Sequence, residues 1–387
     1  MKFYKQWNLL LIIVLTLPSF LQAQIPTKPN IILVLLDDVS PDQFSCYGVE
    51  GAVNTPNIDK LATDGVMFKT CYATAMCGPS RVEIMTGEYG ASTGALHNSI
   101  WKGNSKNKLY SDHQAFGKLL KDAGYATAIA GKWHAGNQMP YESSVGFDEY
   151  CLWENLKEIA KLPGSPTFTG SMEDEKTPSR YWHPGIVKND MLLDTEPSDY
   201  APDIFADFIM DFMERKTQEG TPFLAYWPSV APHGARDGYP STPFKGAIGD
   251  LGPSLNSADA AERLKALNEY IDFLMGKIIQ KVADLGIADN TIIIFTSDNG
   301  TAVTAKTRGV ERGSHVVNII AGPGIKQRGA TDELTDFTDI APTLVELAGG
   351  SLPSGKKFDG ESLLPFLSGA KDTHRDWIYC YLPISQN

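Results

Sequence analysis

The sequence lacks several features that would place the protein in a familiar class. It has no excess of basic residues: the formal net charge of the 387-residue chain is −12, which argues against nucleic acid as a partner. Its five cysteines are an odd number without Cys-x-x-Cys spacing, so they do not indicate a metal site. No internal repeat or coiled-coil pattern is evident. The composition is that of an ordinary globular protein with one large domain or two smaller ones.

A long apolar run is also missing, apart from one near the N-terminus. Residues 1–23 have the pattern of a secretory signal peptide, with Lys2 and Lys5 before an apolar run over residues 9–21 and with Ala23 at its end. The run is short for a membrane span, and an uncleaved anchor is the alternative. We expect a secreted or periplasmic protein whose mature form has no membrane segment.

Short apolar stretches alternate with helical patterns along the rest of the chain. Strands are expected at 30–36, 66–72, 125–130, 223–230 and 291–296, and helices at 55–65, 111–124 and 199–218. Residues 258–285 are expected to form one long amphipathic helix or a pair of helices. This alternation predicts an α/β fold, with a large, mostly parallel sheet between layers of helices. The proline-rich stretch 154–198 breaks the rhythm, and it is either an insertion over a pocket or a plain surface excursion.

Four of the predicted strands are followed by polar residues. The ligand site of an open α/β sheet lies outside the carboxyl ends of its strands, so these residues are expected to converge. Any one of them alone would more simply be a solvated loop residue. They are Asp37 and Asp38, Lys132 and His134, His233, and Asp298 with Asn299.

The converging residues have a common chemical logic. Three carboxylates and an amide oxygen suit a hard cation, Ca²⁺ or Mg²⁺. Arg81, Lys132 and Lys306 add positive charge, and two histidines can transfer protons near neutral pH. A metal and cations around a nucleophile are what the transfer of an anionic sulfuryl or phosphoryl group requires.

A candidate nucleophile lies in the stretch Cys77-Gly-Pro-Ser-Arg81. Pro79 restricts the turn, and Ser80 is expected to be the N-cap of a helix over 81–86. A cysteine at a helix N-terminus beside an arginine is expected to be activated, and a buried idle thiol is the alternative. A free thiol is a poor ligand for a hard cation, so the residues alone leave the role of Cys77 open.

These motifs together resemble the type I sulfatases of the alkaline-phosphatase superfamily over residues 29–369. The stretch from Cys77 to Gly87 is similar to the signature of that family. Further similar motifs are Pro-Asn-Ile-Ile before Asp37, Thr55-Pro-Asn-Ile-Asp, Gly-Lys-Trp-His at 131–134, Ala-Pro-His at 231–233, Ser-Asp-Asn-Gly at 297–300, Asp339-Ile-Ala-Pro-Thr-Leu and Asp359-Gly-Glu-Ser-Leu-Leu-Pro.

The resemblance implies a mechanism. A maturation enzyme would oxidise Cys77 to formylglycine, whose hydrated aldehyde attacks sulfur. Ca²⁺, rather than Mg²⁺, would be bound by Asp37, Asp38, Asp298, Asn299 and the modified Cys77. His233 would protonate the leaving alcohol, and His134 would deprotonate the second hydroxyl to expel sulfate. Arg81 and Lys132 would hold the diol, while Lys132, Lys306 and His233 would bind the substrate.

Some assignments stay open. The family often has arginine and Val-Pro where this chain has His315, Val316 and Val317, so Arg308 is an alternative to Lys306 as the anion contact. Asn98 is a candidate pocket residue. Surface or loop roles are expected for His97, His113, His183 and His374, and packing or disulfide roles for Cys46, Cys71, Cys151 and Cys380.

The C-terminal end departs from the family pattern. Family members usually continue into a small antiparallel subdomain, whereas this chain stops at Asn387. The expected organisation is a catalytic α/β domain over 24–370 and a remnant of a truncated or reduced subdomain over 371–387.

The expected function is hydrolysis of an organic sulfate ester by an exported sulfatase, with a sulfated carbohydrate as the substrate. One alternative is a phosphodiester or phosphonate hydrolase of the same superfamily. Another is an inactive, truncated homologue that binds sulfated glycans.

Overall fold

The computed structural model describes residues 24–98, 109–136, 139–153, 179–234, 238–245, 252–302 and 305–381. The predicted signal peptide and most of the proline-rich stretch, residues 154–178, lie outside these ranges. Within them, no helix is both long and apolar enough to cross a membrane.

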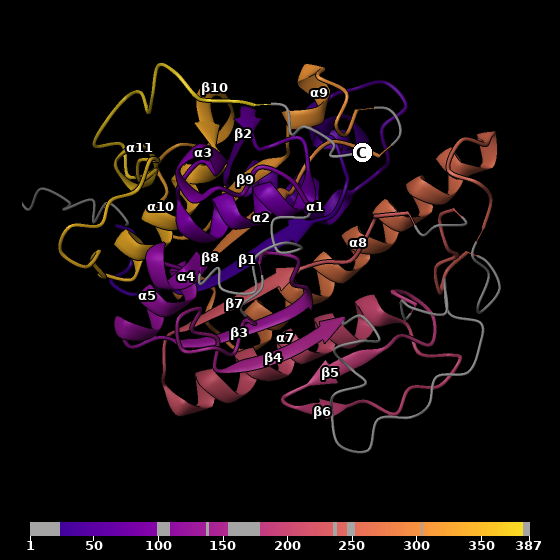
Figure 1. Cartoon of the computed structure of the whole chain (residues 1–387), viewed down its shortest axis with the longest axis horizontal. Helices are drawn as coiled ribbons and strands as arrows, with labels where there is room; N and C mark the ends of the chain where they lie inside the picture. Colours follow the sequence, from indigo (N-terminus) through magenta and orange to yellow (C-terminus); the bar gives the residue numbers. More distant parts are fainter. Residues whose placement is uncertain are drawn as a thin grey trace, which may run out of the picture.

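Ten strands of the described chain form one sheet, in the order β10-β2-β9-β8-β1-β7-β3-β4-β5-β6 (Figure 1). The pairs from β8 through β1, β7 and β3 to β4 are parallel, as is β10 with β2, and the remaining pairs are antiparallel. The strands are β1 (Asn30–Leu36), β2 (Val66–Tyr72), β3 (Ala126–Lys132), β4 (Glu149–Trp153), β5 (Ile186–Lys188), β6 (Met191–Leu192), β7 (Phe223–Pro228), β8 (Thr291–Ser297), β9 (Asn318–Ala321) and β10 (Gly329–Asp336). The predicted mostly parallel α/β fold is confirmed.

Helices surround the sheet (Figure 1). They are α1 (Pro56–Asp64), α2 (Cys77–Thr86), α3 (Gly90–Thr93), α4 (Leu109–Asp112), α5 (Phe116–Asp122), α7 (Ala201–Glu219), α8 (Ala258–Asp284), α9 (Glu311–Ser314), α10 (Ile340–Leu347) and α11 (Leu364–Leu367). The single helix predicted over 111–124 is wrong, because the chain forms α4 and α5 there and the linking Ala115 has extended backbone angles. The long pattern at 258–285 is one helix, α8.

The central strand β1 is buried along its whole length and divides the core in two. Alternate side chains of a strand point to opposite faces of the sheet. Ile31, Leu33 and Leu35 pack in one cluster with residues of α2, α5 and α10. The intervening side chains pack in a second cluster with residues of α1, α7 and α8. Apolar burial on both faces explains why the strand is a continuous apolar run.

Backbone hydrogen bonds continue past the carboxyl ends of the three central strands. Leu36 of β1 is paired with Ser297 of β8. Beyond this pair, Asp298 N donates to Leu36 O at 2.9 Å, and Asp37 N donates to Ala231 O at 3.1 Å. The ladder therefore extends into the loops and fixes the backbone of the predicted site residues against one another.

The chain after α11 forms neither helix nor strand over residues 371–381. It is nevertheless attached through buried ion pairs. Arg375 contacts Asp336 at 2.9 Å and Asp339 at 3.0 Å, and His374 Nε2 lies 3.1 Å from Asp339 Oδ2. Of the surface or loop role expected for His374, the loop position holds and the surface exposure does not, because this network buries its side chain.

Candidate active site

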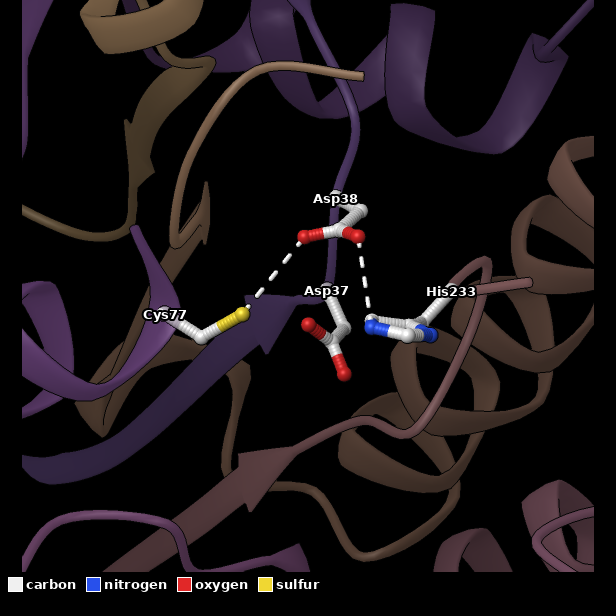
Figure 2. A group of neighbouring side chains, drawn as sticks. All are labelled: Asp37, Asp38, Cys77 and His233. Atoms are coloured by element: carbon white, nitrogen blue, oxygen red, sulfur yellow. Dashed lines mark hydrogen bonds and ion pairs between the residues drawn. The ribbon is translucent and has the colours of Figure 1, made fainter. Parts of the chain in front are cut away.

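Two strand ends and one helix start bring four side chains together at the carboxyl edge of the sheet. Figure 2 shows Asp37 and Asp38 after β1, Cys77 at the start of α2, and His233 in the loop after β7. One ligand atom from each lies within 4.8 Å of the others. Cys77 Sγ is 3.6 Å from Asp38 Oδ1, and His233 Nε2 is 3.3 Å from Asp38 Oδ2. The sequence prediction that these residues converge is confirmed by this geometry.

Helix α2 begins at Cys77, earlier than predicted. Its N-cap is Met76, and Ser80 lies inside the helix, where its hydroxyl donates to the carbonyl oxygen of Thr74. The predicted N-cap at Ser80 is therefore wrong. The side chain of Asn98 takes over part of the capping role, since Gly78 N donates to Asn98 Oδ1 at 2.9 Å.

The thiol of Cys77 is not activated. Burial raises its pKa to about 12, although Lys132 and Lys306 oppose the shift. The guanidinium of Arg81 makes its hydrogen bonds with Asp298 and with the carbonyl oxygen of Lys132 rather than with the sulfur. Desolvation raises the pKa of the thiol by more than the helix N-terminus lowers it. The thiol is therefore neutral and a poor nucleophile.

Lys306 reaches into the site from the loop before α9. Its Nζ lies 2.7 Å from Cys77 Sγ and 2.5 Å from Asp38 Oδ1. Burial alone would lower the pKa of Lys306, but Cys77 and Asp38 outweigh it and hold the pKa well above its ordinary value. Arg308, the alternative anion contact, is exposed. The structure brings Lys306, rather than Arg308, to Cys77.

Arg81 and Asp298 form a fully buried ion pair behind the cluster. Arg81 Nε and NH2 each lie 2.9 Å from Asp298 Oδ2, and NH1 donates to Lys132 O at 2.9 Å. Burial and the neighbouring Asp37 charge raise the pKa of Asp298 to about 7, against the opposing effect of Arg81. Arg81 thus connects the ends of β8 and β3 at the back of the site.

Lys132 is the counter-charge of Asp37. Its Nζ lies 2.7 Å from Asp37 Oδ2. Burial would raise the pKa of Asp37, but Lys132, His233 and Arg81 outweigh it and hold the pKa well below the ordinary range. Asp37 therefore stays ionised in the buried site.

The two predicted histidines have different environments. His134 follows β3 with a positive φ of 45°, and burial, together with Lys132 and Arg81, lowers its pKa well below the ordinary value. His233 Nδ1 lies 2.5 Å from Gly234 O. Because a carbonyl oxygen only accepts, this contact places a ring proton on Nδ1, and Nε2 faces Asp38. Burial and Arg180 lower the pKa of His233 to about 3.

The oxygen atoms of the site fit a hard divalent cation. Asp37 Oδ1 and Asn299 Oδ1 are buried, and among the described residues neither accepts a hydrogen bond. Asn299 Nδ2 donates to Asp38 Oδ1 at 2.8 Å. Asp298 Oδ1 accepts from Asp38 N at 3.1 Å, and its Oδ2 contacts Arg81, so both oxygens of Asp298 already have partners. Buried oxygens without donors are costly unless a cation completes them.

Sequence reasoning missed one charged residue of the site. Arg180, in the stretch 154–198, lies 3.8 Å from Asp37 Oδ2 through its NH1 atom. No motif or strand end marked it, because the surrounding stretch has no regular pattern. The described residues at 179–182 of this stretch therefore lie beside the site, whereas residues 154–178 lie outside the described ranges.

All five cysteines lie in the described residues, and all are free thiols. Cys71 and Cys151 are fully buried in the two hydrophobic clusters. The disulfide alternative for these cysteines is not what the structure shows, whereas the packing role is confirmed for Cys71 and Cys151.

Comparison with protein families agrees with the geometry. The model of the family described as Sulfatase matches residues 29–351. The chain belongs to the sulfatase family. It is accordingly a sulfuric ester hydrolase of the alkaline-phosphatase superfamily, as its motifs predicted.

Curated sulfatases match nearly the whole chain. N-acetylgalactosamine-6-sulfatase of Sus scrofa is 30% identical over 409 residues, covering 97% of this chain and 72% of that protein. Arylsulfatase A of Homo sapiens is 26% identical over 379 residues, covering 91% of this chain and 70% of that protein. The matched part of this sulfatase thus spans 72% and 70% of the lengths of these two relatives.

Three solved structures share the fold. PsFucS1 sulfatase from Pseudoalteromonas sp. has a TM-score of 0.70 and 23% identity, covering 92% of this chain and 75% of that one. Ps i-CgsB in complex with k-i-k-neocarrahexaose has a TM-score of 0.71 and 24% identity, covering 90% and 77%. BT4656 in complex with its substrate D-glucosamine-2-N,6-O-disulfate has a TM-score of 0.62 and 22% identity, covering 91% and 82%.

Proposed function

We propose that this sulfatase is exported and releases inorganic sulfate from a sulfated carbohydrate. The observation that carries the proposal is the convergence of Cys77, Asp38, Lys306 and His233 at one point of the sheet edge. The carbohydrate class is supported by the relatives, since two structural neighbours are complexes with a neocarrahexaose and with a glucosamine disulfate.

We assign the metal site to Asp37, Asp38, Asp298, Asn299 and the group derived from Cys77. Ca²⁺ fits this oxygen set better than Mg²⁺, which demands stricter octahedral geometry. When bound, the ion would neutralise the charge that develops on the sulfate oxygens.

We assign Cys77 as the residue that becomes formylglycine through a separate maturation enzyme. A buried thiol with a pKa raised to about 12 is unsuited to attack, which supports a chemical conversion of the side chain. The converted group would supply the nucleophile.

The remaining residues bind the substrate and move protons. Lys132 and Lys306 would hold the sulfate oxygens, because both ammonium groups lie at the cluster and are pre-oriented by Asp37 and Asp38. Arg81 would position the site through its buried contact with Asp298. Positioning and fixed charge are the main sources of catalysis in the transfer of an anionic group.

The two histidines would divide the proton transfers. His233 Nε2 would protonate the oxygen of the leaving alcohol as the S–O bond breaks. An anionic sulfate beside the ring favours the charged imidazole and opposes the lowering of the pKa that burial and Arg180 cause. His134 is held neutral, which suits a general base in the step that releases sulfate.

Two measurements on the same preparation test the proposal. Mass spectrometry of the peptide with Cys77 should show conversion of the thiol to the aldehyde when the protein is produced with a maturation enzyme. The converted protein should then release sulfate from members of a panel of mono- and oligosaccharide sulfates, and Cys77→Ala should release none while keeping its fold.

Paired substrates separate the alternatives. Faster hydrolysis of an aryl phosphodiester than of an aryl sulfate would favour a phosphodiesterase. Retention on a sulfated-glycan column without sulfate release, despite full conversion of Cys77, would favour a glycan-binding homologue. Either result would contradict the proposed function.

Export is tested at the N-terminus. Cleavage after the proposed signal peptide 1–23 would leave Gln24 as the first residue of the mature protein. N-terminal sequencing of protein from the periplasm or culture medium should find Gln24. A protein that keeps residues 1–23 in the membrane fraction would contradict the proposal.

A further inference from the structure

Arg180 is a buried cation at the edge of the active site without an assigned role. Its side chain is 11% exposed, and NH1 lies 3.8 Å from Asp37 Oδ2. That oxygen already has a closer partner, because Lys132 Nζ lies 2.7 Å from it. A separation of 3.8 Å is too long for a hydrogen bond. Arg180 is therefore not needed to satisfy Asp37.

The guanidinium of Arg180 is short of hydrogen-bond acceptors. In the described ranges, its Nε and NH1 atoms are buried and donate to no acceptor. An arginine stays charged even when it is buried, so it cannot escape this situation by losing a proton. Burying a charged donor without an acceptor is unfavourable, and such a group is retained where a ligand supplies the acceptor.

The position of Arg180 is rigid because of its neighbours. Its Cζ lies 4.5 Å from the ring centroid of Trp153, which fixes the guanidinium over the indole. Trp153 ends β4 and is paired in register with Lys132, the last residue of β3. The stack thus places Arg180 beside a proposed sulfate-binding lysine at the same sheet edge.

The next two residues anchor the segment from the other side. Tyr181 OH donates to His233 O at 2.7 Å, and Trp182 Nε1 donates to Ser241 Oγ at 3.1 Å. Tyr181 and Trp182 are both buried. Arg180 is therefore held between the indole of Trp153 and the loop that carries His233, which is where a leaving alcohol would lie.

We propose that Arg180 is a substrate-binding residue, whose guanidinium donates to an anionic oxygen of the bound sulfate ester on the side of the leaving alcohol. This inference rests on the proposed sulfatase chemistry and names a further contact of the same site. The anionic oxygen belongs either to the scissile sulfate or to a second acidic group of the substrate beside it. Arginine suits both because its planar donors match oxyanions.

The test compares two chromogenic esters that differ by one acidic group. 4-Nitrocatechol sulfate carries an acidic hydroxyl next to the sulfate ester, and 4-nitrophenyl sulfate lacks it. Steady-state kinetics with protein converted at Cys77 are measured for the wild type, Arg180→Met and Arg180→Lys. Inorganic sulfate serves as a competitive inhibitor to report on sulfate binding alone.

Loss of a charge-assisted contact should raise KM for 4-nitrocatechol sulfate about 10- to 100-fold in Arg180→Met, with a smaller change in kcat. Arg180→Lys keeps the charge and should recover part of the loss. An equal rise in KM for 4-nitrophenyl sulfate and in Ki for inorganic sulfate assigns the contact to the scissile sulfate. A rise confined to 4-nitrocatechol sulfate assigns it to the second acidic group.

A matched control is Arg215→Met. Arg215 also lies over an aromatic ring, that of Phe212 at 5.8 Å, but it pairs with Glu149 at the opposite end of β4 from Trp153. Its kinetic constants should stay at wild-type values. The thermal unfolding midpoint of each variant shows that it is folded, and Arg180→Lys remains available if Arg180→Met does not fold.

The inference is overturned if Arg180→Met keeps KM and Ki within about twofold of wild type for every ligand, whether or not kcat or the unfolding midpoint falls. That pattern would make Arg180 a structural counter-charge of Asp37. Failure of the proposed function has a different signature, because the wild-type protein itself would then release no sulfate from either ester.

Discussion

The ammonium of Lys306 lies 2.7 Å from the sulfur of Cys77, although 229 positions of sequence separate the two residues. The same ammonium contacts Asp38 at 2.5 Å. One cation therefore joins the end of β1, the first residue of α2 and the loop before α9. Whatever group occupies the place of the thiol will face a fixed positive charge.

Replacing Lys306 should slow sulfate release. Lys306→Met keeps most of the side-chain length and removes the charge that faces Cys77 and Asp38. We expect kcat/KM to fall about 100- to 1000-fold, the usual effect of losing one preorganised electrostatic donor. Sulfate release by protein with equal conversion of Cys77 is the measurement.

Arg308→Met is the matched control for Lys306, because Arg308 is two residues away in the same loop and is exposed. It should stay close to wild-type activity. Equal losses in the two variants would show that the loop, rather than the Lys306 ammonium, carries the effect.

Calcium should stabilise the fold through the oxygen cluster. Binding to the native state alone raises the unfolding midpoint by mass action, so added Ca²⁺ should raise it and EGTA should reverse the rise. Asn299→Ala removes a buried oxygen that accepts no hydrogen bond among the described residues and should weaken Ca²⁺ at least about 10-fold by calorimetry.

Mg²⁺ at the same concentration is the control for the identity of the ion. It should give a smaller rise of the midpoint than Ca²⁺. A rise of equal size with both ions, or one that survives in Asn299→Ala, would contradict the assigned site.

Glu83 should make the stability depend on pH. It is a buried carboxyl in α2 that accepts hydrogen bonds from Thr74 N and Oγ1, and burial, together with Asp336, raises its pKa well above the ordinary value. A raised pKa in the folded state gives stability that is present below the unfolded pKa and is lost as the pH rises through the folded pKa.

Glu83→Gln can still accept from Thr74 and cannot ionise. Its unfolding midpoint relative to wild type should therefore improve as the pH rises from about 5 to about 9. Thermal unfolding of both proteins across this range is the measurement. Parallel curves would mean that Glu83 does not ionise on folding or unfolding in this range.

Asn98 should stabilise the start of α2. Asn98→Ala removes the acceptor of Gly78 N, and loss of such a cap costs about 1 kcal/mol of the free energy of unfolding. Asn98→Asp keeps an acceptor and adds a negative charge near the helix N-terminus, which is favourable. Urea unfolding should rank the aspartate variant above the alanine variant, and the reverse order would contradict a capping role.

The sequence predicted the central strands and the convergence of their polar ends. The run at 30–36 is apolar on both faces, and a short run of this kind indicates a central strand that is buried on both sides. Once β1, β7 and β8 are parallel neighbours, Asp37, His233 and Asp298 must meet at one edge. Periodicity and the position of the polar residues were sufficient for these conclusions.

Predictions that depended on local rules were less successful. Ser80 has a suitable side chain for an N-cap, but the chain starts the helix at Cys77, where Asn98 supplies an acceptor from a distant segment. The thiol of Cys77 has the right neighbours in sequence to be acidic, yet its burial decides the pKa. Solvent exclusion is a property of the folded molecule and cannot be derived from adjacent residues.

Arg180 was missed for a related reason. Arg180 contacts Trp153 and Asp37, and the adjacent Tyr181 contacts the loop of His233, so the partners come from three separate strand ends. Only the assembled sheet brings them together. A proline-rich stretch gives no periodic signal from which such contacts could be derived.

Backbone hydrogen bonds continue past the ends of the central strands. They affect both amide hydrogen exchange and the way in which mutation can change substrate preference. The amide hydrogens of Asp37 and Asp298 should exchange with deuterated solvent about as slowly as those of the central strands, although both residues lie in loops. The reactive centre is thus built before any substrate arrives. Segments such as the one around Arg180 can then change by mutation and alter the preferred ester without rebuilding the chemistry beneath them.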